Sequence, residues 1–92
     1  MSSTEDVTTI HLSGELDMGS APQLAACMQA VLATRPDRVV VDCADLTFMD
    51  SAGIAVLVTA WNNTDGRTAL RNLRPIVRRV IAVTGLDDLV DE

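Results

Sequence analysis

The sequence predicts an α/β fold in which one small sheet carries helices packed on it. Strand-like segments alternate along the chain with segments whose apolar residues recur every three or four positions, in the order β-α-β-α-β-α. The chain has 92 residues, of which 48% are hydrophobic and 22% charged. This balance is typical of a globular protein, and the length allows one domain. We therefore expect one domain over residues 1–92, with the polar residues 1–6 disordered.

The first strand is expected at residues 7–13, where apolar and polar residues alternate. Residues 14–17, Gly-Glu-Leu-Asp, break the alternation and predict a loop. A helix then begins after Ser20, which stands as its N-cap, with Pro22 in the first turn and Gln23 placed to close a capping box. Its apolar stripe ends where a second proline follows.

The second strand is expected at residues 38–43, whose β-branched run is typical of a central strand covered on both faces. Apolar residues continue after a turn at residues 44–45. A second helix begins at Ser51 and is apolar almost all round, which predicts that it is largely buried. Gly53, in its first turn, would let another part of the backbone approach closely.

The third strand is expected at residues 67–73, and Pro75 opens a third helix with one apolar stripe. Gly85 follows that helix, where a left-handed residue is favoured. Residues 86–92 form a short acidic tail.

Two cysteines, Cys27 and Cys43, form no CxxC pair and have no histidine near them in sequence. Cys27 shares the apolar stripe of the first helix, and Cys43 ends a run of β-branched residues. We interpret both as small buried hydrophobes that react slowly with thiol reagents, with a regulatory disulfide as the alternative.

Charge and composition argue against several classes of protein. Seven basic residues against thirteen acidic ones give a net charge of −6, which does not suit a nucleic-acid-binding surface. The longest nearly unbroken apolar run, residues 52–61, is about half of what a bilayer span needs. Residues 1–6 lack the character of a secretory signal. We expect a cytoplasmic protein that neither inserts into a membrane nor binds nucleic acid.

The sequence lacks the residues of a recognisable active site. A nucleophile elbow requires G-x-S-x-G, but Met49 stands two positions before Ser51. The one histidine, His11, lies on the polar face of the first strand without an acidic or thiol companion at ligand spacing. No phosphate-binding glycine loop and no zinc spacing occurs. We therefore expect no catalytic residue, no metal and no cofactor.

Five short motifs occur in an order that is more specific than any one of them. They are LSGELD at 12–17, AP at 21–22, VVVD at 39–42, LTFMDSAG at 46–53 and VRRVIAVTGL at 77–86. Together they resemble the anti-anti-sigma factors, the anti-sigma factor antagonists built on the STAS domain, over about residues 7–90. The resemblance implies a STAS-like domain with a small mixed sheet of four-stranded type packed with helices.

The resemblance also implies a role for Ser51 as a phosphate acceptor. In the family, the phosphate comes from an anti-sigma factor that is also a serine kinase with a histidine-kinase-like ATP fold, and a metal-dependent serine phosphatase removes it. Phosphorylation would switch binding of the anti-sigma factor off. The residues implied to make the partner surface are Glu15, Asp17, Asp50, Ser51, Ala52 and Gly53.

Family members usually begin with a hairpin strand and end with another strand and helix, so this domain is expected to be shortened at both ends. An open sheet edge of this kind would favour a homodimer or a bound partner. Two other interpretations stay open. One is a stand-alone STAS adaptor subunit of a membrane transport assembly, in which Ser51 is only a helix cap. The other is a small-ligand sensing module.

The ends of the first two strands are expected to lie together, because sequential strands neighbour one another about two-thirds of the time. This arrangement would bring Glu15 and Asp17 close to Asp50 and Ser51. The resulting acidic patch predicts a salt-sensitive association with a basic partner surface.

Overall fold

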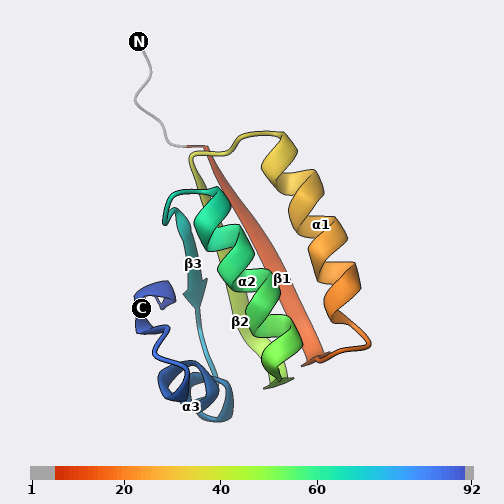
Figure 1. Ribbon diagram of the computed structural model, residues 1–92, viewed down its shortest axis with the longest axis vertical. Helices are drawn as coiled ribbons and strands as arrows, with labels where there is room; N and C mark the ends of the chain where they lie inside the picture. The colour runs from red at the N-terminus through yellow and green to blue at the C-terminus, as the bar shows by residue number, and fades with distance from the viewer. Residues whose placement is uncertain (1–5, 91–92) are drawn as a thin grey trace.

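The computed structural model describes residues 6–90, so most of the expectation for residues 1–6 lies outside the described residues. The elements are β1 (Val7–Leu16), α1 (Ala21–Ala33), β2 (Arg38–Met49), α2 (Ser51–Asn63), β3 (Thr68–Arg71), α3 (Pro75–Val83) and a short 3₁₀ turn at Asp87–Leu89. The predicted α/β class and the order of strands and helices are confirmed (Figure 1).

The strands form one sheet in the order β1-β2-β3, and both outer strands run parallel to β2. The expected mixed sheet of four-stranded type is therefore corrected, for residues 6–90, to a parallel sheet of three strands. The reason is connectivity, because a helix follows each strand and a strand–helix–strand unit returns the chain in the same direction. Beyond β3, an isolated parallel bridge joins Leu70 to Val90.

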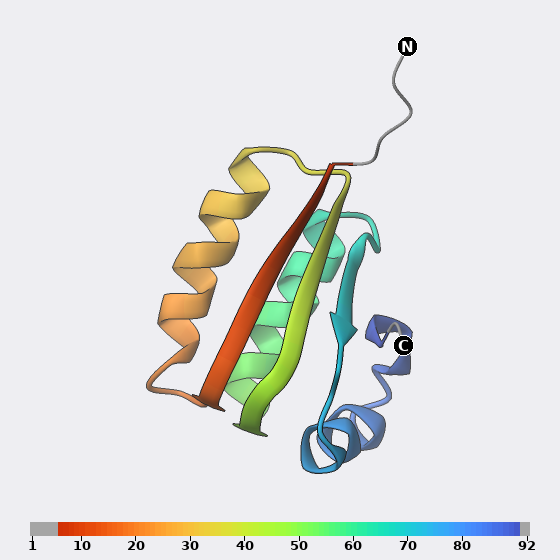
Figure 2. The ribbon, with the colours of Figure 1, turned by 180° about the vertical axis from the view of Figure 1, so that it is seen from behind.

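Helices α1 and α2 cover one face of the sheet, whereas no helix of residues 6–90 lies over β1 and β2 on the other face (Figures 1 and 2). The expectation that β2 is a central strand is confirmed, but within the described residues only one of its faces is covered by helices. Val39 and Val41 point into the core under the helices. Val40 belongs to the opposite face by alternation and is still only 5% exposed, because its neighbours on β1 and β3 flank it.

Strands β1 and β2 are longer than predicted. Residues 14–16 continue β1, and residues 44–49 continue β2, where a loop and a turn were expected. Two register shifts, between His11 and Ser13 and between Gly14 and Glu15, each insert one extra residue of β2 into the ladder. Such bulges break the alternation of apolar residues without ending the strand.

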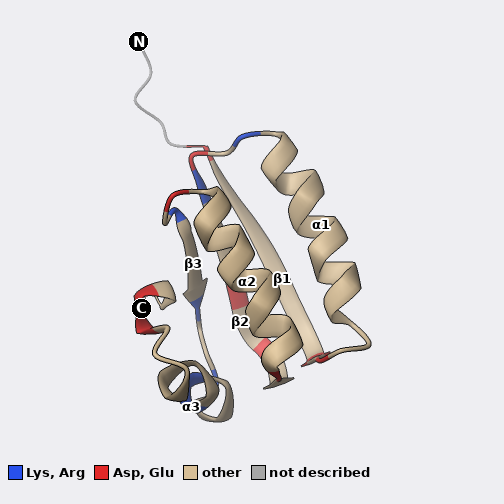
Figure 3. Ribbon diagram, in the orientation of Figure 1, with Lys and Arg blue, Asp and Glu red and all other residues tan. Residues whose placement is uncertain are grey.

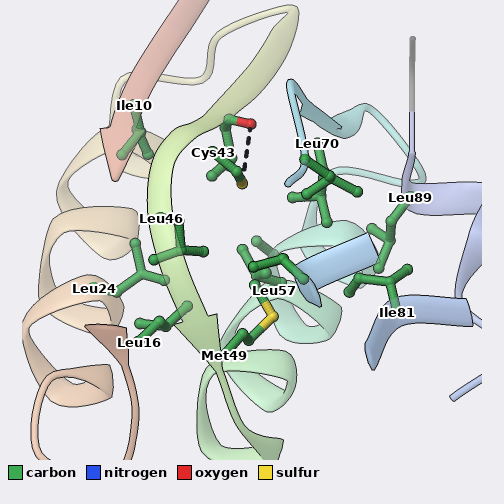
Figure 4. Close-up of a cluster of buried hydrophobic side chains, with 14 of the residues drawn as sticks. Ile10, Leu16, Leu24, Cys43, Leu46, Met49, Leu57, Leu70, Ile81 and Leu89 are labelled. Atoms are coloured by element: carbon green, nitrogen blue, oxygen red, sulfur yellow. Dashed lines mark hydrogen bonds between the residues drawn. The ribbon is translucent and has the colours of Figure 1, made fainter. Parts of the chain in front are cut away.

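The core lies between the sheet and the three helices, and Figure 4 shows its side chains converging from all of these elements. Helix α2 buries Gly53, Leu57 and Ala60, while Ala55 and Thr59 face solvent. The expectation that α2 is largely buried is therefore corrected to a half-buried helix. It packs on the sheet and beside α1, which leaves one side of the helix open.

The C-terminal part follows the prediction more closely. Val77 and Ile81 of α3 are buried, and Gly85 has the expected left-handed backbone with φ of 75°. Leu89 is buried in the core, so the acidic tail is anchored by one of its apolar residues. Among the helices formed by residues 6–90, none is both long and apolar enough to cross a bilayer.

Candidate functional site

The candidate site lies where β1 and β2 end at the same edge of the sheet. Their last residues, Leu16 and Met49, are paired. The backbone N–H of Asp50 donates a hydrogen bond of 3.1 Å to the carbonyl oxygen of Leu16. The entry into α2 is thus tied to the start of the β1–α1 loop, and the expected side-by-side placement of the first two strands is confirmed.

Asp50 is the N-cap of α2. Its backbone is extended, and its Oδ1 accepts hydrogen bonds from the N–H groups of Ala52 at 2.9 Å and Gly53 at 3.4 Å. Two of the donors that a helix leaves open at its start are satisfied in this way. The negative charge of the carboxylate also suits the positive end of the helix dipole.

Ser51 is the first residue of α2 and is exposed. Within residues 6–90, its hydroxyl group has no hydrogen-bond partner. Because Asp50 supplies the cap, the hydroxyl of Ser51 is not needed to hold the first turn. The side chain is accessible to an enzyme that modifies hydroxyl groups, and it stands at the positive end of the helix.

Gly53 allows β1 and α2 to come into close contact. A Cβ atom at this position would lie 2.5 Å from Cγ of Leu16 and 3.2 Å from the carbonyl oxygen of Leu16. Real Cβ atoms essentially never lie closer than 3.0 Å to another heavy atom, so the contact with Cγ of Leu16 means that a side chain here would push the end of β1 away from α2. The close backbone approach predicted from the sequence is confirmed.

The β1–α1 loop is held by Asp17. Its Oδ1 accepts hydrogen bonds from the N–H groups of Gly19 at 2.9 Å and Ser20 at 3.1 Å. The hydroxyl of Ser20 donates to the carbonyl oxygen of Glu15 at 2.7 Å and accepts from the N–H of Asp17 at 3.0 Å. The predicted capping box of Ser20 with Gln23 is wrong, because this hydroxyl group is engaged in the loop instead.

Charged and apolar side chains both surround this edge. Glu15 is exposed and pairs in register with Phe48 of β2. Acidic segments lie at the carboxyl ends of β1 and β2 (Figure 3). Met18 and Phe48 expose 78% and 41% of their surface, although sequence reasoning gave neither a role. Their exposure depends on the bulges and on the loop path, which residue spacing alone does not reveal.

A second polar cluster lies on the face of the sheet that α1 and α2 do not cover, away from the ends of β1 and β2. Nδ1 of His11 is 3.4 Å from Oδ2 of Asp42, so the histidine has the acidic companion that the sequence did not reveal. The cross-strand register places them opposite each other. Oδ1 of Asp42 also accepts from the N–H of Ala44 at 3.0 Å and from Nδ2 of Asn72 at 3.2 Å.

These contacts lower the pKa of Asp42 from its ordinary value of 3.8. The hydrogen bond from Ala44 is the largest cause, followed by that from Asn72, while partial burial opposes them and His11 adds a smaller effect. Among residues 6–90, no three His, Cys, Asp or Glu side chains lie close enough together to hold a metal ion.

The chain is similar to a known protein family and to curated proteins. The family model described as Mlab, STAS domain matches residues 1–91. The anti-sigma-B factor antagonist of Bacillus subtilis is 30% identical over 90 residues, which span 95% of this chain and 82% of that protein.

Two solved structures of SpoIIAA are similar to this chain throughout. The unphosphorylated anti-sigma factor antagonist SpoIIAA has a TM-score of 0.83 at 27% identity, covering 99% of this chain and 83% of the other. The Bacillus cell fate determinant SpoIIAA in its phosphorylated form has a TM-score of 0.73 at 27% identity, covering 99% and 86%.

Proposed function

The chain belongs to the STAS domain family, and from this premise we propose that it is an anti-sigma factor antagonist switched by phosphorylation of Ser51. The observation that carries the proposal is that Ser51 presents an exposed hydroxyl group at the first position of α2. Asp50 caps the helix, so this hydroxyl group is not needed as a cap. The resemblance of the chain to SpoIIAA, of which a phosphorylated form is known, supports it.

In the unphosphorylated state, the partner packs against the edge formed by Glu15, Asp17 and the residues from Asp50 to Gly53. Phosphorylation adds about −1.5 to −2 charge at pH 7. A bulky dianion then replaces a small hydroxyl group inside the contact. A loss of about 3–4 kcal/mol would weaken binding roughly 200- to 1000-fold. No change of fold is needed for a switch of that size.

The phosphate is compatible with the folded domain. It would stand at the positive end of α2, where an anion is tolerated or favoured. Oδ1 of Asp50 already accepts from the N–H groups of Ala52 and Gly53, so these donors are not open to the phosphate. The added charge therefore stays at the surface, where it meets the partner.

The partners proposed with this role are an anti-sigma factor serine kinase with a histidine-kinase-like ATP fold and a metal-dependent serine phosphatase. The chain itself acts as substrate and binding protein in the bacterial cytoplasm and performs no catalysis. A homodimer is compatible with the same role.

The test is incubation of the chain with ATP and candidate anti-sigma factor kinases, followed by mass mapping of phosphate. Ser51→Ala should abolish phosphorylation and keep partner binding, whereas Ser51→Asp should weaken binding with little loss of stability. Thr59→Ala is the matched control, because Thr59 is an exposed hydroxyl on the same helix.

Phosphate on Thr47, Thr59 or Ser20, with Ser51→Ala unchanged, would exclude the assigned site. Stable association with transporter subunits, in the absence of any phosphorylation, would favour the adaptor interpretation instead.

A further inference from the structure

Strand β1 lies at the outer side of the sheet, and one of its two edges carries no strand among residues 6–90 (Figures 1 and 2). The strand is 10 residues long and contains neither lysine nor proline, the residues that commonly protect such edges. A free edge of this kind presents backbone N–H and C=O groups that another extended chain can pair with.

A groove of about 220 Å³ runs between this edge and α1. Its floor is apolar, formed by Ile10, Leu16, Leu24 and Leu46, and its rim includes Glu15 and Cys27. Consecutive residues of β1, from both faces of the sheet, line the groove, so it opens at the strand edge. A strand added there would place every second side chain over the apolar floor.

Charge indicates what kind of strand fits. Glu15 is the one acidic residue among those that line the groove, and none of the lining residues is lysine or arginine. The whole chain has a net charge of −6. A second copy would bring a further −6 to the same groove, whereas a basic segment is attracted to it.

We propose that the free edge of β1 and the groove beside it bind an extended segment of a partner protein as an added strand. In that segment, apolar residues alternate with lysine or arginine. This inference goes beyond the proposed function and does not depend on phosphorylation of Ser51.

The probe is a synthetic peptide in which lysine and valine alternate over about eight residues. Cys27 on the groove rim reports occupancy through its rate of reaction with a thiol reagent, and the buried Cys43 is the internal control. At a peptide concentration about twice the Kd, the reaction of Cys27 should slow by about threefold, because the rate follows the unoccupied fraction. Amide hydrogen exchange along β1 should slow in parallel.

Matched reagents separate strand addition from other effects. A peptide with proline in place of its central valines, and one with glutamate in place of lysine, should not protect Cys27. Glu15→Gln should weaken binding of the lysine peptide by about threefold, as expected for the loss of one exposed ion pair. Thr59→Ala, at an exposed position of α2 outside the groove, should bind the peptide as the unchanged chain does. The test uses neither kinase nor ATP, so its outcome is independent of the phosphorylation proposal.

Unchanged rates for both Cys27 and the β1 amides would overturn the proposal. Equal protection by the proline peptide would also overturn it, since binding would then not involve a strand. If the chain alone is a dimer whose β1 amides are already protected, the edge is taken by a second copy and the proposal fails.

Discussion

At the scale of single residues, the two cysteines occupy opposite environments. Cys43 is fully buried, and burial, followed by the nearby charge of Asp42, raises the pKa of its thiol to about 12. Cys27 is exposed on α1, so the expectation that both are buried is wrong for this one. The apolar stripe read from the sequence is wider than the face that α1 buries, which consists of Ala21, Leu24 and Met28.

We therefore predict two widely separated thiol reaction rates. At pH 8, Cys27 should react with a disulfide reagent about as fast as an unstructured thiol, whereas Cys43 should react only as fast as the domain opens, because the thiolate is the nucleophile. Cys27→Ser should remove the fast phase and leave the slow one. A fast reaction of both thiols in the folded chain would contradict the burial of Cys43.

Asp42 predicts a pH dependence of stability. A carboxyl group whose pKa is lowered on folding stabilises the fold fully above its unfolded value of 3.8, and this contribution is lost as the pH falls through the lower folded value. Above pH 3.8, the unchanged chain should therefore have a larger free energy of unfolding than the Asp42→Asn chain. The difference between the two chains should shrink in acid. Asn72→Ala, which removes one hydrogen-bond donor to Asp42, should reduce this pH-dependent difference in the free energy of unfolding. A difference in the free energy of unfolding that is the same at all pH values would exclude this contribution of the Asp42 carboxylate.

At the scale of elements, the contact between the end of β1 and the first turn of α2 fixes the geometry of the candidate site. Gly53→Ala should raise helix propensity by about 1 kcal/mol. It should nevertheless destabilise the domain by about 1–3 kcal/mol, because the new Cβ overlaps Leu16. Denaturant titration measures the change, and Ala55→Gly, on the solvent side of the same helix, calibrates the propensity effect. A stabilised Gly53→Ala chain would contradict the close contact.

The sequence predicted the strands and helices whose signals are local. Alternation around Ile10 and the β-branched run at Val39 located two strands, and Pro75 located the start of α3. It missed the extensions of β1 and β2, because a bulge is a property of two paired strands and leaves no periodic signal in either. The same holds for the pairing of His11 with Asp42, which depends on cross-strand register.

At the scale of the whole molecule, the candidate site was predictable in its position more than in its contacts. Parallel neighbouring strands end at the same edge, so sequence order alone brought Asp17 and Ser51 to one region. Which residue caps α2 and which one shapes the β1–α1 loop could not be predicted from residue spacing. Asp50 took the cap and left Ser51 exposed, while Asp17 became the acceptor that shapes the β1–α1 loop.

The charge distribution of the whole domain leads to the last prediction, which concerns association with the proposed partner. Acidic residues at the carboxyl ends of β1 and β2, in a chain with net charge −6, should steer a basic surface toward the edge (Figure 3). Asp17→Asn removes one of these charges and retains an Oδ1 acceptor for the N–H groups of Gly19 and Ser20.

The Asp17→Asn chain should associate with the anti-sigma factor kinase about two- to fivefold more slowly at low salt, and with a flatter salt dependence. Its melting temperature should stay nearly unchanged, because the loop keeps its hydrogen bonds. Stopped-flow association over a range of ionic strength measures both effects, with Asp65→Asn as a control, since Asp65 lies in the α2–β3 connection. Equal association rates for the unchanged and Asp17→Asn chains at low salt would place the β1–α1 loop outside the contact and leave the partner surface on the α2 side alone.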